Sequence, residues 1–170
     1  MTKYLAIAAI TLDGKIAKNS KHVSDWTSKE DKVFMRALLD ECDVIIVGNN
    51  TYKTAIKPLS KRNCIVFSKS VNQLISKSIN LTYINPQKSD LKKLIRAKKY
   101  KKIAILGGAQ TYSYCLQNNL LDELYLTIEP IVFGQGINLF ANNYQPNKKF
   151  KLVSATKLNK HGTVLLHYQK

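Results

Sequence analysis

The sequence is poor in the residues that build metal sites and disulfide frameworks. Its three cysteines, Cys42, Cys64 and Cys115, lie far apart without a paired spacing, and its three histidines form no ligand pattern with them. Buried free thiols are therefore expected, and no metal site is predicted. A chain of 170 residues needs no such support, because one domain of that length buries a sufficient core.

Long apolar runs are also missing. No stretch approaches the roughly 20 apolar residues that cross a bilayer, and the short apolar run after Met1 lacks a small-residue cleavage site. Hydrophobic residues still make up 45% of the chain, too many for a disordered protein. With no repeat, low-complexity tract or linker, the sequence predicts a single domain over residues 1–170, cytoplasmic and without a membrane partner.

Acidic residues and arginine are scarce, whereas lysine is abundant. Basic residues number 27 against 11 acidic ones, the formal net charge is +16, and only three of the basic residues are arginine. Nucleic-acid interfaces favour Arg, because its planar guanidinium forks onto phosphates and bases. A nucleic-acid partner is therefore not predicted. The positive field would still attract a multiply anionic small molecule.

What the sequence does contain is an alternation of short apolar runs and helix-like stretches. The expected strands cover residues 4–11, 44–47, 64–67, 81–84, 103–106 and 124–129. The expected helices cover residues 29–41, 50–56, 89–98 and 109–116. This order predicts an α/β domain with a mostly parallel sheet. Residues 130–139 are expected to form a long connection or a bulged edge, and residues 150–158 and 163–168 an antiparallel hairpin.

Paired glycines, Gly107 and Gly108, stand between the expected strand 103–106 and the helix-like stretch 109–116. A strand that turns through glycines into a helix exposes free backbone N–H groups at the helix start, and that arrangement suits a phosphate. A plain reversal of the chain would use the same residues. From the turn alone, both interpretations are open.

A carboxylate lies on an apolar helix face. Asp31, Met35, Leu38 and Cys42 follow one another at spacings of four, three and four, so they share one side of the expected helix. An inward-facing carboxyl in such surroundings should have a raised pKa. Asp31 is therefore a candidate for binding a ligand.

Helix capping is the alternative role for this carboxylate. Thr27 with Glu30, and Ser28 with Asp31, both have the spacing of a capping box, and an acidic residue is favourable in a first helical turn. If Thr27 forms the capping box with Glu30, the Asp31 carboxyl stays available to bind a ligand.

The segment before this helix, residues 14–25, is long and lacks clear periodicity. Long loops of this kind are often lids, so we expect it to close over a ligand. Trp26 lies at its end, where the indole either lines a flat ligand pocket or serves as a core anchor.

Taken together, these motifs resemble dihydrofolate reductase in the same order and at closely similar spacings over nearly the whole chain. The residues that carry the resemblance are Ala8-Ala9, Asp13, Trp26-x4-Asp31, the run Val47 to Tyr52, Pro58-Leu59-x2-Arg62-Asn63, Ser68, Leu106-Gly107-Gly108-x3-Tyr112 and Leu124-Tyr125-Leu126-Thr127. The resemblance implies a three-layer α/β/α fold with a mixed, mostly parallel sheet of about eight strands and a C-terminal antiparallel hairpin.

Other stretches are more typical of the riboflavin-pathway pyrimidine reductases of the same superfamily. They are Leu12 to Ala17, Leu121-Asp122-Glu123-Leu124, Pro130 to Gly136 and Leu139-Phe140. That branch would need a site for a ribose phosphate, and its usual acidic pair is absent from residues 53–57. The same fold is therefore compatible with two enzymes, dihydrofolate reductase and the pyrimidine reductase.

Three residues favour the folate enzyme. Asp31 matches the family's carboxylate that pairs with an aminopyrimidine edge, and a carboxylate can accept two parallel N–H bonds there. Thr127 matches the strand Thr that supports that carboxylate. Arg62 matches the Arg that forks onto the α-carboxylate of the folate tail; a surface Arg beside a turn is its structural alternative. Ala8, Ala9 and Met35 are the further expected substrate contacts, and Trp26 the further catalytic one.

Both readings imply NADPH as the reductant. By the resemblance, the cofactor-binding residues are Gly48, Asn49, Asn50, Thr51, Ser68, Lys69, Gly107, Gly108, Ala109, Gln110, Thr111 and Tyr112. The position after Gly48 is usually basic in the family and is Asn49 here. Lys69 or Lys53 could compensate, so the preference for NADPH over NADH stays open.

The activity that the resemblance implies is hydride transfer to C6 of dihydrofolate with protonation at N5, which yields tetrahydrofolate. The alternatives are a riboflavin-pathway reductase of 5-amino-6-ribosylaminouracil phosphate and a non-catalytic NADPH-binding protein of the same fold. The superfamily includes monomers and homodimers, and both assemblies stay open.

Overall fold

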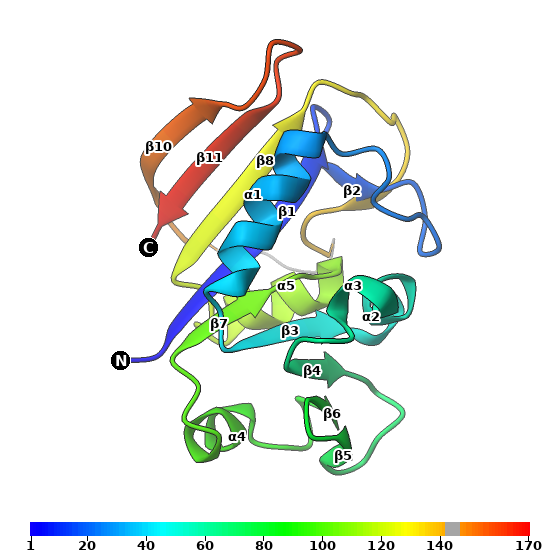
Figure 1. Cartoon of the computed structure of the whole chain (residues 1–170), viewed down its shortest axis with the longest axis vertical. Coiled ribbons are helices and arrows are strands. Elements are labelled where there is room, and N and C mark those ends of the chain that lie inside the picture. Colours follow the sequence, from blue (N-terminus) through cyan, green and yellow to red (C-terminus); the bar gives the residue numbers. More distant parts are fainter. Residues whose placement is uncertain (142–146) are drawn as a thin grey trace.

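A nine-stranded sheet is the centre of the molecule (Figure 1). The computed structural model describes residues 1–141 and 147–170. The strands of the main sheet are β1 (Lys3–Thr11), β3 (Val44–Gly48), β4 (Cys64–Phe67), β5 (Ile75–Ser78), β6 (Leu81–Ile84), β7 (Lys102–Ile105), β8 (Glu123–Glu129), β10 (Lys151–Lys157) and β11 (Val164–Gln169). Their order in space is β10-β11-β8-β1-β7-β3-β4-β6-β5.

Six strands of this sheet run parallel: β1 pairs in parallel with β7 and β8, β3 with β7 and β4, and β4 with β6. At one edge β5 is antiparallel to β6, and at the other β10 and β11 form the antiparallel hairpin. The expected mixed, mostly parallel sheet with a C-terminal hairpin is confirmed. The sheet has nine strands rather than about eight.

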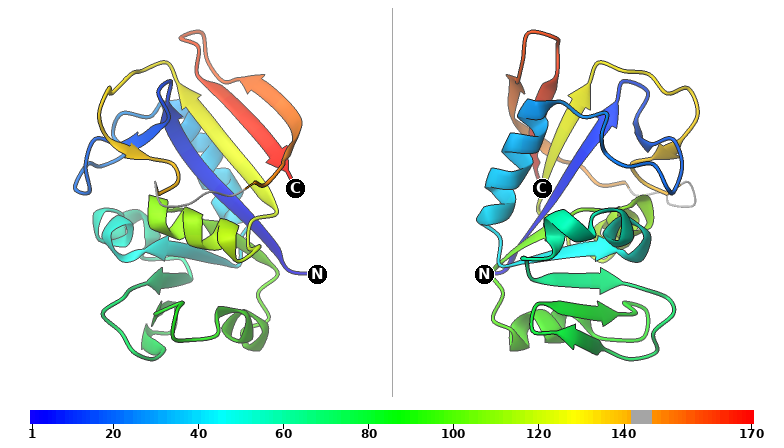
Figure 2. Two further views of the ribbon diagram at one scale, coloured as in Figure 1. Left: turned by 180° about the vertical axis from the view of Figure 1, so that it is seen from behind. Right: turned by 45° about the vertical axis from the view of Figure 1, so that its right-hand side comes forward.

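Helices cover both faces of the sheet, as the views in Figure 2 show. They are α1 (Lys29–Asp40), α2 (Asn49–Thr54), α3 (Ile56–Leu59), α4 (Leu91–Ala97) and α5 (Ala109–Gln117). On one face Ile45 and Val47 pack with residues of α1, α2 and α3, and on the other Ile46 packs with residues of α4 and α5. The expected three-layer α/β/α arrangement is therefore confirmed.

The central strands are apolar at every position because they have no solvent-facing side. Val44, Ile45, Ile46 and Val47 are each at most 1% exposed. A strand with one wet face would alternate polar and apolar residues. Continuous apolar runs, rather than alternation, are what made the parallel strands recognisable in the sequence.

Three short strands were not expected. β2 (Lys15–Ala17) lies inside the predicted lid and pairs with β9 (Ile137–Asn138), which lies inside the predicted connection 130–139. β5 pairs with β6 at the sheet edge. β2 has three residues, β5 four and β9 two, so these strands are too short for an alternation of polar and apolar residues to reveal them. The predicted helix 50–56 is interrupted at Ala55, between α2 and α3.

All three cysteines are free thiols, as expected. Cys64 and Cys115 are buried and Cys42 is half-buried. Burial raises the pKa of Cys115 to about 12.

No helix in the described part of the chain is long and apolar enough to cross a membrane.

Shortening a side chain at the centre of the sheet tests this packing. Ile105 on β7 is fully buried, so Ile105→Ala should lower the free energy of unfolding by about 3 kcal/mol through lost burial and a cavity. Val33 on α1 is 56% exposed, and Val33→Ala should change stability by less than about 0.5 kcal/mol. Urea unfolding of both variants measures the difference; equal losses would contradict the described core.

Candidate active site

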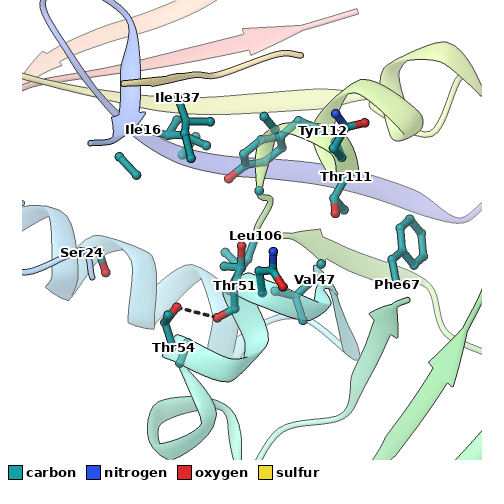
Figure 3. A pocket seen from close by; sticks show the side chains of 18 of the residues that line it. Ile16, Ser24, Val47, Thr51, Thr54, Phe67, Leu106, Thr111, Tyr112 and Ile137 are labelled. Atoms are coloured by element: carbon teal, nitrogen blue, oxygen red, sulfur yellow. Dashed lines mark hydrogen bonds between the residues drawn. The ribbon is translucent and has the colours of Figure 1, made fainter. Parts of the chain in front are cut away.

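A large cleft of about 1530 Å³ opens where the parallel strands end. Ala8 and Ala9 line it from β1, Gly48 from β3, Phe67 from β4 and Leu106 from the end of β7. In Figure 3, Ile16 and Ile137 of the small β2–β9 sheet lie across the cleft from Val47, Thr51 and Leu106. Ligands of open α/β sheets bind in such a crevice at the carboxyl ends of the strands.

Two strand-to-helix turns meet on one wall of this cleft. The Gly48 N–H donates to the Gly107 carbonyl oxygen over 2.6 Å, which joins the turn after β3 to the turn after β7. A Cβ at Gly48 would lie 2.8 Å from Thr111 Oγ1, and a Cβ at Gly108 would lie 3.2 Å from Thr51 Oγ1. The backbones therefore approach as closely as they do only because side chains are absent there.

Glycine is also required at Gly107 for conformational reasons. Its φ is +81°, and a Cβ would lie 2.5 Å from the ring of Tyr112. Tyr112 is in turn fixed, because its hydroxyl donates to the Ile7 carbonyl oxygen over 2.6 Å. The peptide between Gly107 and Gly108 is cis.

The starts of α2 and α5 both face the cleft without a side-chain cap. Gly48 and Gly108 are the N-cap residues, and neither supplies a capping hydrogen bond. The first-turn residues that line the cleft are Asn49, Asn50 and Thr51 of α2 and Ala109, Gln110, Thr111 and Tyr112 of α5. Backbone N–H groups in such turns suit the phosphates of a dinucleotide, so these residues fit the cofactor role predicted for them.

Ser68 and Lys69, after β4, line the same cleft. The Ser68 and Ser70 hydroxyls hydrogen bond over 2.7 Å, so the turn is ordered by its own side chains. Of the two lysines considered as replacements for a basic residue at Asn49, Lys69 lines the cleft and Lys53 does not. Asn85 and Gln87 also line the cleft, although the sequence analysis did not predict them. The only feature of the sequence that could have indicated them is the Asn85-Pro86 pair, which is typical of a turn.

Asp31 lies at the other end of the cleft, at the start of α1. The helix is capped by Ser28, whose hydroxyl accepts the Asp31 N–H over 3.2 Å. The alternative cap by Thr27 is not what the structure shows. The Asp31 carboxyl is 5% exposed and accepts hydrogen bonds from the hydroxyls of Thr127 and Thr27.

Burial raises the pKa of the Asp31 carboxyl above its ordinary value, and the negative charge of Glu129 adds to that increase. The hydrogen bonds from Thr127 and Thr27 act in the opposite direction, since they stabilise the ionised form. Desolvation outweighs them, as the apolar helix face predicted. The carboxyl thus holds its proton to a higher pH than an exposed Asp does.

Most of the remaining predicted residues also line the cleft. Met35 lies one turn after Asp31 on α1, next to the Asp31 end, and Trp26 lies at the base of the predicted lid. The Trp26 ring packs edge to face on Phe133 at 5.1 Å, and its Nε1 is buried without a partner among the described residues. Trp26 thus lines the cleft, as the ligand-pocket interpretation predicts, and it packs on a half-buried ring of the connection rather than in either core cluster.

Two of the predicted residues support the site from behind. Thr127 on β8 is 2% exposed, and its hydroxyl hydrogen bonds to the Asp31 carboxyl, which lines the cleft. Gly107 directly precedes Gly108 in the turn and packs against the Tyr112 ring. Neither is a lining residue.

Arg62 lies on the cleft wall but is already paired. Its Nη2 lies 2.5 Å from Asp40 Oδ1, the acidic residue at the end of α1. Lys32 and Arg36 of α1 and Lys57 of α3 line the same region and were not predicted. Their positions depend on how α1 docks beside α3, which no local pattern reports.

Replacing Gly107 separates steric conflict from backbone strain. Gly107→Ala must displace the Tyr112 ring in addition to adopting a positive φ, so we expect a loss of about 3 kcal/mol and weaker NADPH binding. Gly134 has a similar φ of +73° and nothing within 4 Å of its Cβ position, so Gly134→Ala should lose only about 1 kcal/mol. Urea unfolding and NADPH titration of both variants measure this; equal losses would show that the Tyr112 contact is unimportant.

The raised pKa of Asp31 also makes a prediction for stability. Because the native state binds this proton more tightly than the unfolded chain, the carboxyl lowers stability as pH rises from the ordinary Asp pKa through the raised one. Asp31→Asn removes that loss. The stability of the variant relative to the wild type should therefore increase as the pH rises from about 4, the ordinary Asp pKa, through the raised pKa. Urea unfolding across this range tests the sign, and a constant difference would contradict it.

Solved structures share this architecture. A solved pyrimidine reductase-like protein from Corynebacterium diphtheriae superimposes with a TM-score of 0.81 at 18% identity, covering 99% of this chain and 91% of that one. A putative riboflavin biosynthesis protein from Shewanella sp. PV-4 gives 0.75 at 19% identity, covering 99% and 98%. At these identities the likeness concerns the fold.

Sequence comparison identifies the family. The protein YwjB of Bacillus subtilis is 28% identical over 180 residues, which cover 98% of this chain and 97% of YwjB. The family model of the RibD C-terminal domain matches residues 3–164. These findings support the riboflavin-branch reading better than the folate reading that Asp31, Thr127 and Arg62 favoured. The chain belongs to the RibD C-terminal domain family, within the dihydrofolate reductase-like superfamily.

Proposed function

We propose that this protein is an NADPH-dependent reductase of the riboflavin-pathway type, which reduces the ribosylamino group of a 5-amino-6-ribosylaminouracil phosphate to a ribitylamino group. The observation that carries the proposal is the shared cleft: two uncapped glycine turns line one part of it and the buried Asp31 carboxyl lies at the other. A dinucleotide and a small ring could therefore bind side by side. Family membership supports this branch of the superfamily.

The glycine turns would hold the cofactor, which when bound supplies a hydride. Backbone N–H groups of Asn49, Asn50, Ala109 and Gln110 would bind its diphosphate. Lys69 would stabilise a 2′-phosphate beside the serine-rich turn, in place of the basic residue missing at Asn49. This assignment favours NADPH over NADH.

Asp31 would orient the pyrimidine and supply the proton that the reaction requires. Its carboxyl oxygens can accept N–H bonds from the aminopyrimidine ring while Thr127 and Thr27 hold them in place. Conversion of ribosylamino to ribitylamino adds a hydride to C1′, breaks the bond from C1′ to the ring oxygen, and adds a proton to that oxygen. A carboxyl with a raised pKa is suited to supplying the proton, through a water molecule if the distance requires one.

Cationic side chains on the cleft wall suit an anionic substrate. The cleft is lined by Lys32, which directly follows Asp31, and by Arg36 and Lys57, and the chain as a whole carries a net charge of +16. A ribose phosphate matches these cations. The acidic pair usual in the pyrimidine reductases is absent here, where Thr54, Ala55 and Lys57 line the wall instead, so the contacts to the sugar differ from the family's pattern.

Dihydrofolate is the second candidate substrate. The specific observation in its favour is that Asp31 and Thr127 form the carboxylate–hydroxyl pair that the folate reading requires. Arg62, its predicted partner for the folate tail, is paired with Asp40, so it would have to leave that carboxylate to bind the tail.

NADPH oxidation by the purified protein tests the proposal directly. We expect turnover with 5-amino-6-ribosylaminouracil 5′-phosphate to exceed turnover with dihydrofolate. Asp31→Asn should keep the fold and the affinity for NADPH but lose roughly a hundredfold or more in turnover at neutral pH. Faster turnover of dihydrofolate would transfer the assignment to the folate enzyme. NADPH binding without oxidation of either substrate would indicate a non-catalytic protein, and a fully active variant would remove Asp31 from its role.

A further inference from the structure

A second buried carboxylate, Glu129, lies close to Asp31 at the end of β8. It is 3% exposed, and both of its oxygens accept hydrogen bonds: Oε1 from the Ser28 backbone N–H over 2.6 Å, and Oε2 from the Thr163 hydroxyl over 2.7 Å. Glu129 is not among the residues that line the cleft, so its role is not direct contact with a ligand.

In a complete capping box, the Ser28 backbone N–H would donate its hydrogen bond to a side chain of α1 itself. In a capping box the N-cap hydroxyl accepts the N–H of the third helical residue, and the side chain of that residue accepts the N-cap N–H in return. Here the first half is present, because Ser28 Oγ accepts the Asp31 N–H. The second half is not, because Glu129 takes the Ser28 N–H in place of Asp31.

Glu129 also ties the start of α1 to the C-terminal hairpin. Thr163, which donates to Glu129, accepts a hydrogen bond from Asn159 Nδ2 over 3.0 Å, and the same amide lies 3.2 Å from Glu30 Oε2. The start of α1 is therefore held by Glu129 of β8 at Ser28 and by Asn159, in the turn between β10 and β11, at Glu30. This places the helix start independently of any contact made by the Asp31 side chain.

We infer that Glu129 is a positioning residue for Asp31: it accepts the backbone N–H that a complete capping box would assign to Asp31, and so leaves the Asp31 carboxyl turned to Thr127 and the cleft. In a complete capping box the Asp31 carboxyl would accept that N–H instead. The inference rests on the proposed function only in treating the Asp31 end of the cleft as the place where a ring substrate binds.

The charge of Glu129 gives this role a second, measurable consequence. The charged and titratable groups that act on Asp31 are Glu129 on β8, Lys32 on α1 and Tyr112 on α5. Glu129 raises the pKa of Asp31 and Lys32 lowers it. Removing the negative charge while keeping the shape of the side chain should therefore lower the pH at which Asp31 titrates.

The deciding experiment follows Asp31 itself by NMR of its ¹³C-labelled carboxyl, with the signal identified by its loss in Asp31→Asn. In Glu129→Gln, whose amide oxygen can still accept the Ser28 N–H, the midpoint of the Asp31 titration should fall. Glu123→Gln is the matched control. Glu123 is also 3% exposed on β8, but it lies about 20 Å away along the strand and binds Lys3, Tyr125 and His167.

Kinetics separate the positioning role from the charge. Glu129→Ala removes the acceptor altogether, so KM for the pyrimidine substrate should rise about tenfold, the effect of one lost hydrogen bond to a charged group, while the affinity for NADPH is retained. Glu129→Gln should keep KM within about threefold of the wild type.

An unchanged Asp31 midpoint in Glu129→Gln, or an equal fall in Glu123→Gln, would overturn the electrostatic role of Glu129. A KM in Glu129→Ala no higher than that in Glu129→Gln would overturn its positioning role. Because the titration needs no substrate, a wild-type protein that reduces neither pyrimidine nor dihydrofolate would refute the proposed function alone and leave the titration informative.

Discussion

The hydrogen bond from the Gly48 N–H to the Gly107 carbonyl oxygen is the contact on which the cleft depends. It joins the turns after β3 and β7 at 2.6 Å, a separation that leaves no room for a side chain at either turn. Because β3 and β7 are neighbouring parallel strands, α2 and α5 then begin side by side while covering opposite faces of the sheet. One paired turn thus presents two helix N-termini to a single ligand.

Electrostatics divide the cleft into two parts with different chemistry. The turns of α2 and α5 offer backbone donors and partial positive charge, which suit phosphates. The far end offers a desolvated carboxyl whose pKa is raised by burial and by the neighbouring Glu129. Glu129 in turn depends on the C-terminal hairpin through Thr163. A residue close to the end of the chain therefore contributes to the state of a side chain near its beginning, although the two are far apart in sequence.

The resemblance to a superfamily was more informative about architecture than about the substrate. Asp31, Thr127 and the glycine turns are compatible with either enzyme, since both bind a dinucleotide and an aminopyrimidine-like ring in one crevice. Arg62 was one of the three residues that favoured the folate enzyme in the sequence, and its pairing with Asp40 weakens that argument. The residues that would distinguish a ribose phosphate from a folate tail, such as Lys32, Arg36 and Lys57, come from two helices, α1 and α3, that are separate in the sequence.

The sequence by itself determined the layered α/β fold, because strands buried on both faces must be continuously apolar and helices between them must be amphipathic. It also determined which carboxyl lies on an apolar helix face, whereas the need for glycine at Gly48 and Gly107 followed from the close approach of the two turns and of Tyr112. Only the tertiary structure decided how Asp31 is used. Local spacing allowed a capping box with Ser28, and that possibility was removed by Glu129, a residue about one hundred positions away. The short strands β2, β5 and β9 were likewise decided by pairing partners distant in the chain, since so few residues carry no periodicity of their own.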